Sequence, residues 1–167
     1  MPEATAPTSR WRALRVPDAA GAIYGTIAAM AVIAGSARTQ SHGGVLALTV
    51  ATLVVFWLAH VYAQALAHHL RGARRLEWKA VAAAMVEERP LLEGPALLLL
   101  LLALGEIGLL DERLAVDLAL WAGVALLVGW GIAYARSQRW AWPMAVTAGV
   151  VNGTFGLAIV VLEVAVH

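Results

Sequence analysis

Two histidines and a glutamine lie four residues apart along a strongly apolar stretch between Phe56 and Arg75. His60, Gln64 and His68 fall on one stripe of a helix, because side chains four residues apart are neighbours on its surface. Imidazoles bind metal ions and move protons near neutral pH. His60 and His68 are ~12 Å apart along a helix axis, too far to share one metal ion. A metal site here would therefore need further ligands from other helices.

Other ionisable residues lie within or at the ends of apolar segments, where charge is costly and often marks an ion pathway. Asp18 and Glu93 would share the inner leaflet with His60, and Glu106 would lie in the outer leaflet. Carboxylates and imidazoles can replace the hydration shell of a cation. We therefore predict a cation path with a divalent metal ion as substrate and no resident cofactor, and its ligands are His60, Glu93, Glu106 and Asp18.

A structural interpretation of the same residues stays open. His60 could hydrogen-bond a neighbouring backbone carbonyl or Tyr24. Asp18 could cap the first helix, and Glu93 could cap the third. Each group would then be satisfied locally and would carry no ion.

The composition determines the kind of elements that must position these groups. The 167 residues are 61% hydrophobic and 14% charged, with a mean hydropathy of +0.75. An ordinary soluble domain is about half apolar and about a quarter charged. The chain has too few polar residues to cover a water-facing surface, so we predict an integral membrane protein. The absence of cysteine excludes disulfides, thiolate metal sites and cysteine nucleophiles.

The hydropathy pattern predicts an all-α fold, a bundle of five transmembrane helices in a single domain over residues 17–167. Residues 1–16 are polar and are predicted to form a disordered cytoplasmic tail. A signal peptide cut before Arg38 is an alternative for the first apolar segment. A short amphipathic helix at about 70–89 is predicted on the inner membrane surface. The five spans, each long enough for ~30 Å of hydrocarbon, are placed at about 19–37, 45–67, 91–110, 114–135 and 143–165.

The distribution of basic residues predicts the orientation. Arg38 and Arg113 are the only two of the 12 Lys and Arg residues that five spans place outside, and the other ten fall inside. This asymmetry follows the positive-inside rule. We predict a multi-pass protein of the cell membrane with a cytoplasmic N-terminus and an outer C-terminus. Asp117 follows Arg113 by one helical turn, which predicts a local ion pair.

Two glycine pairs are candidates for close helix contacts. Gly21 and Gly25 lie in the first span, and Gly149 and Gly153 lie in the fifth. The spacing G-x-x-x-G puts both glycines on one face, so that another helix backbone can approach. The pairs indicate a tight bundle or a homodimer, without deciding between them.

Several function classes lack their motifs. A phosphate-binding glycine loop, an H-E-x-x-H pair and a nucleophile elbow are all missing, so the sequence gives no indication of an enzyme. The arginines at 71–75 adjoin a span, which indicates membrane topology and contact with anionic lipid rather than nucleic-acid binding.

Five spans with a helical cytoplasmic insertion between the second and third are similar to the vacuolar iron transporter family. That family has an acidic residue in its first span and a cytoplasmic metal-binding region with Glu and Met. The corresponding segments are PDAAGAIYGTI, with Asp18, and WKAVAAAMVEERP, with Met85, Glu87 and Glu88. The insertion is shorter than in the family, the expected "DG" is absent, and His60 replaces small and acidic residues. The composition also fits a small bacterial membrane protein.

The leading functional prediction is a transporter of a small cation or metal ion. The alternative is a membrane subunit or scaffold without transport, which binds a partner protein or anionic lipid through its glycine faces and basic inner loop. A transporter predicts a hydrated cavity at His60 with Glu93 or Asp18 nearby. A scaffold predicts a dry core in which each polar group is satisfied locally.

Overall fold

The computed structural model describes residues 19–70 and 78–165, and these residues form helices without any strand. Asp18, the predicted tail and the first part of the predicted surface helix lie outside the described residues. The helices are α1 (Ala19–Ser36), α2 (His42–Leu70), α3 (Trp78–Glu87), α4 (Arg89–Glu93), α5 (Ala96–Glu106), α6 (Glu112–Ser137) and α7 (Trp142–Ala165).

Four of these helices, α1, α2, α6 and α7, are long and apolar enough to cross a membrane. Their lengths range from 18 to 29 residues, and about 20 residues at 1.5 Å per residue match the hydrocarbon thickness. The predicted class, a helical protein with several possible membrane spans, is confirmed at this level.

The third predicted span differs from the expectation, because it is two short helices and not one long helix. α4 has 5 residues and α5 has 11. Pro95 follows Gly94 at the break, and its ring removes a backbone donor and obstructs the preceding turn. The Gly-Pro step after Glu93 predicts a distorted helix, and in the structure it ends α4 altogether.

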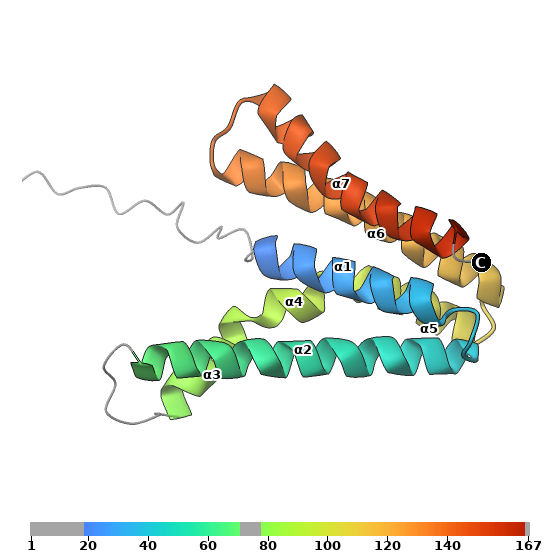
Figure 1. Cartoon of the computed structure of the whole chain (residues 1–167), viewed down its shortest axis with the longest axis horizontal. Helices are drawn as coiled ribbons and strands as arrows, with labels where there is room; N and C mark the ends of the chain where they lie inside the picture. Colours follow the sequence, from blue (N-terminus) through green and yellow to red (C-terminus); the bar gives the residue numbers. More distant parts are fainter. Residues whose placement is uncertain (1–18, 71–77, 166–167) are drawn as a thin grey trace, which may run out of the picture.

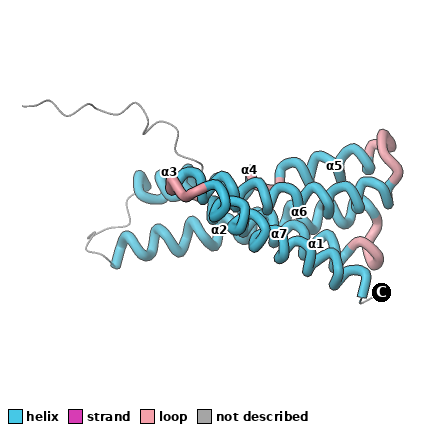
Figure 2. The backbone as a smooth tube through the Cα atoms, turned by 90° about the horizontal axis from the view of Figure 1, so that it is seen from above, coloured by secondary structure: helices cyan, strands magenta, loops and turns pink. Residues whose placement is uncertain are grey.

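Successive long segments run in opposite directions (Figure 1). α1 leads from one end of the bundle to the other, and α2 returns. α4 and α5 together follow the direction of α1, α6 returns, and α7 again follows α1. We call the end where α7 finishes the C-terminal end. The α1–α2 and α5–α6 connections lie there too, as both views show (Figures 1 and 2).

α1 is the central helix, and it packs against α2, α4, α6 and α7. Half of its residues are buried, against 22% in the most apolar windows of α2 and α7. The core consists of buried apolar side chains from α1, α2, α4, α5 and α6, among them Met30, Ile33, Leu98, Leu102 and Leu127. The outward faces of α2 and α7 are apolar as well, which lipid would tolerate and water would not.

The glycines of α1 lie against α4 within the same chain. A Cβ on Gly25 would collide with the backbone carbonyl of Leu91 and come within 2.9 Å of its carbonyl carbon. Opposite it, a Cβ on Gly94 would lie 2.6 Å from the oxygen of Ala22. Gly21 is looser, since a Cβ there would lie 3.4 Å from the backbone nitrogen of Leu91. The missing side chains let the two backbones approach directly.

The second glycine pair lies against α6. A Cβ on Gly149 would be 2.9 Å from the oxygen of Val128, and one on Gly153 would be 2.7 Å from the side chain of Val128. Gly131 faces them from α6, where a Cβ would lie 2.7 Å from the oxygen of Ala148. Both pairs therefore sit at helix contacts inside one chain, and a homodimer stays a prediction.

Candidate functional site

Three hydroxyl groups inside the bundle are satisfied by their own helices, whereas the buried indole nitrogens of Trp57 and Trp130 have no hydrogen-bond partner among the described residues. The hydroxyls of Thr26, Ser36 and Thr49 donate to carbonyls one turn earlier, each at 2.7 Å. Such bonds to the preceding turn remove the cost of burying a hydroxyl without requiring water. These residues therefore give no sign of a hydrated path.

His60, the central residue of the predicted cation path, follows the same pattern. Its Nδ1 lies 2.8 Å from the carbonyl oxygen of Phe56. Because a carbonyl only accepts, Nδ1 carries the proton and donates. The ring also packs against Tyr24, with centroids 5.2 Å apart. Gln64, one turn on, donates to Glu88 at 3.2 Å, which ties α2 to the residue between α3 and α4.

The other predicted ligands are not brought together. Glu93 is exposed at the end of α4, and Glu106 is exposed at the end of α5, with the whole of α5 between them. Asp18 lies outside the described residues. Within residues 19–70 and 78–165, no group of three or more His, Asp or Glu side chains could hold a metal ion. The predicted cation path is therefore not a cluster in the described part of the chain.

A polar cavity of about 590 Å³ lies at the C-terminal end. Four segments form it: the loop after α1, the start of α2, the first turns of α6 and the last turns of α7. Its lining includes two arginines, three carboxylates and a histidine, which are Arg38, Arg113, Glu112, Asp117, Glu163 and His42. The loop after α1 leads directly into α2, but α6 and α7 are far from them in the sequence and reach the cavity because the helices alternate in direction.

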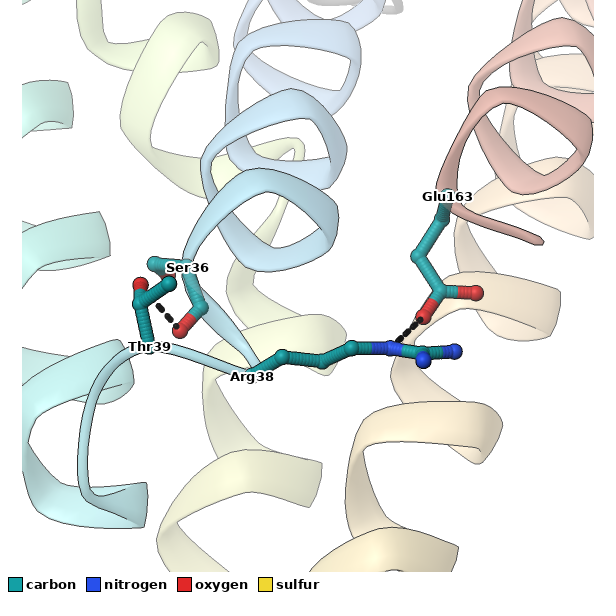
Figure 3. Close-up of polar contacts among 4 residues, drawn as sticks. All are labelled: Ser36, Arg38, Thr39 and Glu163. Carbon is teal, nitrogen blue, oxygen red and sulfur yellow. Dashed lines mark hydrogen bonds and ion pairs between the residues drawn. The ribbon is translucent and has the colours of Figure 1, made fainter. Parts of the chain in front are cut away.

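Two residues that line this cavity, Arg38 and Glu163, form an ion pair (Figure 3). Nε of Arg38 lies 3.4 Å from Oε1 of Glu163 and joins the loop after α1 to the last turns of α7. The arginine side chain is 50% exposed and the glutamate 15%. An ion pair this open to solvent contributes roughly 0–1 kcal/mol, so it can open without a large penalty.

The ion pair predicted between Arg113 and Asp117 is absent. Across the described residues, Arg38 with Glu163 is the one pair within 4.0 Å. Both α6 side chains are exposed, where water screens their attraction. Their order is also the less favourable one, since an acid stabilises a helix pair better when it precedes the base.

His42 holds the start of α2 beneath the cavity. It is only 7% exposed, and its Nε2 donates to the carbonyl oxygen of Leu102 in α5 at 2.8 Å. Gly105 leaves room for the ring, because a Cβ there would lie 2.6 Å from Nε2. Ser41 caps α2, with Gly44 N donating to its hydroxyl at 3.2 Å. The sequence identified this segment only as a connection, so His42 was missed.

Glu106 lies beside the first turn of α2. A Cβ on Gly43 would be 2.8 Å from its Oε1. A carboxylate is favourable near a helix N-terminus, where backbone N–H groups carry partial positive charge. This position gives Glu106 a structural role, in which it stabilises the start of α2 at its junction with α5.

Comparisons with known proteins add no relative: no family model, no curated protein and no solved structure matches the chain. The resemblance to vacuolar iron transporters therefore stays a prediction from topology. The fold and the cavity define the class of protein: it is helical, several of its helices are able to cross a membrane, and it has a charged cavity at one end. Function has to be argued from that cavity and from the core beneath it.

Proposed function

We propose that this is a multi-pass protein of the cell membrane that binds a ligand in the cavity at the C-terminal end, on the outer side, and conducts no ion through its centre. The cavity above an apolar core carries this proposal. Met30, Leu98, Leu102 and Leu127 each have 0% exposure beneath it. Ligand sites typically combine a concave surface with a few convergent polar groups.

Five crossings are part of the proposal, with α4 and α5 as a broken third crossing. Residues 89–106 would reach ~27 Å at helical rise, close to the hydrocarbon thickness. A break at this depth is tolerated where the backbone is covered by protein. Gly94 and Pro95 are both buried, and Gly94 lies against the backbone of Ala22.

The charges support an outward orientation of the C-terminal end. That end carries five carboxylates and only two basic residues, Arg38 and Arg113, of the 12 in the chain. The positive-inside rule places such an end outside. The five carboxylates are Glu106, Asp111, Glu112, Asp117 and Glu163.

Contact with membrane lipid at the opposite end is the second element of the proposal. Trp78 and Val86 of α3 are 74% and 58% exposed, and they lie eight residues apart, on one side of the helix. Apolar side chains there would enter the inner membrane surface. The arginines at 71–75 lie outside the described residues, and their contact with anionic lipid remains a prediction from the sequence.

Cation transport, the leading prediction from the sequence, is the weaker proposal. It gains support from carboxylates at both ends of the bundle. It loses support because no group of three or more His, Asp or Glu side chains in the described residues could hold a metal ion. The bond from His60 Nδ1 to Phe56 O leaves Nε2 able to bind a metal, so this bond does not decide between the two proposals.

Uptake into proteoliposomes separates the two proposals. The purified protein is reconstituted and tested with a panel of divalent cations and with protons, and an added ionophore confirms that the vesicles are sealed. We expect uptake no faster than in protein-free vesicles. Uptake by the wild type that His60→Ala abolishes would instead establish the transport proposal.

A further inference from the structure

Three of the five charged side chains that line the cavity are not paired with one another. In the described part of the chain, the side chains of Glu112, Arg113 and Asp117 form neither a hydrogen bond nor an ion pair. All three are exposed on the first two turns of α6 and line the cavity. In the remaining pair, Nε of Arg38 lies 3.4 Å from Glu163, and the arginine side chain is half exposed whereas the glutamate is mostly covered. The cavity thus presents donors and acceptors that a ligand can take up.

The mixture of acidic and basic side chains in the cavity disfavours ligands that carry charge of only one sign. A lone anion would meet the carboxylates of Glu112, Asp117 and Glu163, and a lone cation would meet the guanidinium groups of Arg38 and Arg113. Like charges brought together oppose binding and so contribute to specificity. A zwitterion avoids both penalties, because a guanidinium fork binds an oxyanion and carboxylates accept bonds from an ammonium group.

The surroundings indicate where such a ligand comes from. Leu114 and Leu118, next to the charged residues on α6, are 47% and 40% exposed, and Leu162 on α7 is 63% exposed. Acyl chains could therefore lie along α6 and α7 while a headgroup occupies the cavity. The cavity volume of about 590 Å³ falls within the ~300–1,000 Å³ of small-molecule sites.

We propose that the cavity binds an ammonium–phosphate zwitterion, the chemistry of an ethanolamine phospholipid headgroup and of free phosphoethanolamine. Arg113 would hold the phosphate, and Asp117 with Glu112 would hold the ammonium group. The inference rests on the proposed function, because it presumes that this cavity is a binding site.

The test uses the full chain in a non-ionic detergent and isothermal titration calorimetry. The probes are dihexanoyl phosphatidylethanolamine, free phosphoethanolamine, dihexanoyl phosphatidylglycerol and ethanolamine. We expect one of the first two to bind and the two single-charge probes to bind more weakly. Preference for the lipid identifies a headgroup site, and equal binding of phosphoethanolamine identifies a soluble ligand.

Variants assign the binding to the cavity. Asp117→Asn and Arg113→Gln should each weaken binding about fivefold, as expected for partly exposed charges. Glu106→Gln removes a carboxylate at the same end that does not line the cavity, and Arg89→Gln removes a distant arginine, so both should bind as the wild type does. Exchanging the two charges, Arg113→Asp with Asp117→Arg, should restore most of the affinity and shows that the variants fold.

Two results would overturn the inference in different ways. Phosphatidylglycerol or ethanolamine binding as tightly as the zwitterions, and lost in Asp117→Asn or Arg113→Gln, would refute the zwitterion and leave the cavity as a binding site. Binding that no cavity variant weakens, or no binding of any probe, would refute the assignment of these ligands to the cavity. Either of these two outcomes would also remove the support for the proposed function.

Discussion

The glycine with the least room for a side chain gives the sharpest prediction about the folding of the bundle. Gly25 of α1 touches the backbone of Leu91 in α4, and a Cβ at that position would overlap the Leu91 carbonyl group. Gly35, ten residues further along the same helix, has no atom within 4 Å of the equivalent position. The substitutions Gly25→Ala and Gly35→Ala therefore add the same methyl group to one helix in two different environments.

The two substitutions should change the free energy of unfolding differently. Overpacking costs typically about 1–3 kcal/mol, and Gly25 belongs near the upper end because the obstacle is backbone that cannot rotate away. Alanine is better than glycine in a helix by about 1 kcal/mol. The net destabilisation for Gly25→Ala is therefore about 2 kcal/mol. Gly35→Ala keeps only the propensity term and should be neutral or slightly stabilising.

Thermal unfolding in detergent, followed by the fluorescence of the 7 tryptophans, measures both effects. A loss of about 2 kcal/mol corresponds to a decrease in Tm of about 4–8 °C at this chain length. Equal shifts in Tm for the two variants, or no shift for Gly25→Ala, would refute the direct contact between α1 and α4. Either result would also remove the support that this contact gives to a broken third crossing.

Three further predictions concern local structure and topology. Arg139 and Gly108 both have positive φ, 61° and 74°, just after α6 and α5. In thermal unfolding, Arg139→Gly should therefore raise the free energy of unfolding and Gly108→Ala should lower it, each by about 1 kcal/mol; changes of the same sign would contradict this. Asp111 accepts bonds from two backbone N–H groups at the start of α6, at 3.0 and 3.3 Å, so Asp111→Ala should cost about 1 kcal/mol and Asp111→Asn much less, as thermal unfolding will show. Single-cysteine variants at Ile107 and Glu87 should react with an impermeant maleimide from opposite sides of the membrane, whereas reaction from one side would make α4 and α5 a re-entrant segment.

Much of the fold could be predicted from the sequence because lipid imposes simple rules. A helix that crosses the membrane satisfies its own backbone, so length and hydropathy alone were enough to find α1, α2, α6 and α7. The third span was harder. Its apolar run looks continuous, and the Gly94–Pro95 step indicated a distortion but not two helices of 5 and 11 residues. That outcome depends on the packing of Gly94 against α1.

The candidate site was much less accessible to sequence reasoning. His60 stood out as a polar residue deep in a span, but the acceptor in its helix, Phe56 O, is present in every helix and leaves no sequence signal. The cavity joins Arg38 to Glu163, which are 125 residues apart, and adds residues from α2 and α6. A single sequence does not reveal which ends of distant helices meet.

Access of water to the centre of the bundle tests the central claim most directly. The chain contains no cysteine, so single-cysteine variants at Asp117, His60 and Met30 report on three positions without background. In sealed vesicles with the C-terminal end outward, a water-soluble maleimide should label the Asp117→Cys variant rapidly and leave the other two unlabelled. Labelling of Met30→Cys or His60→Cys at a rate approaching that of Asp117→Cys would show a hydrated path through the core and would contradict a binding site above a closed bundle.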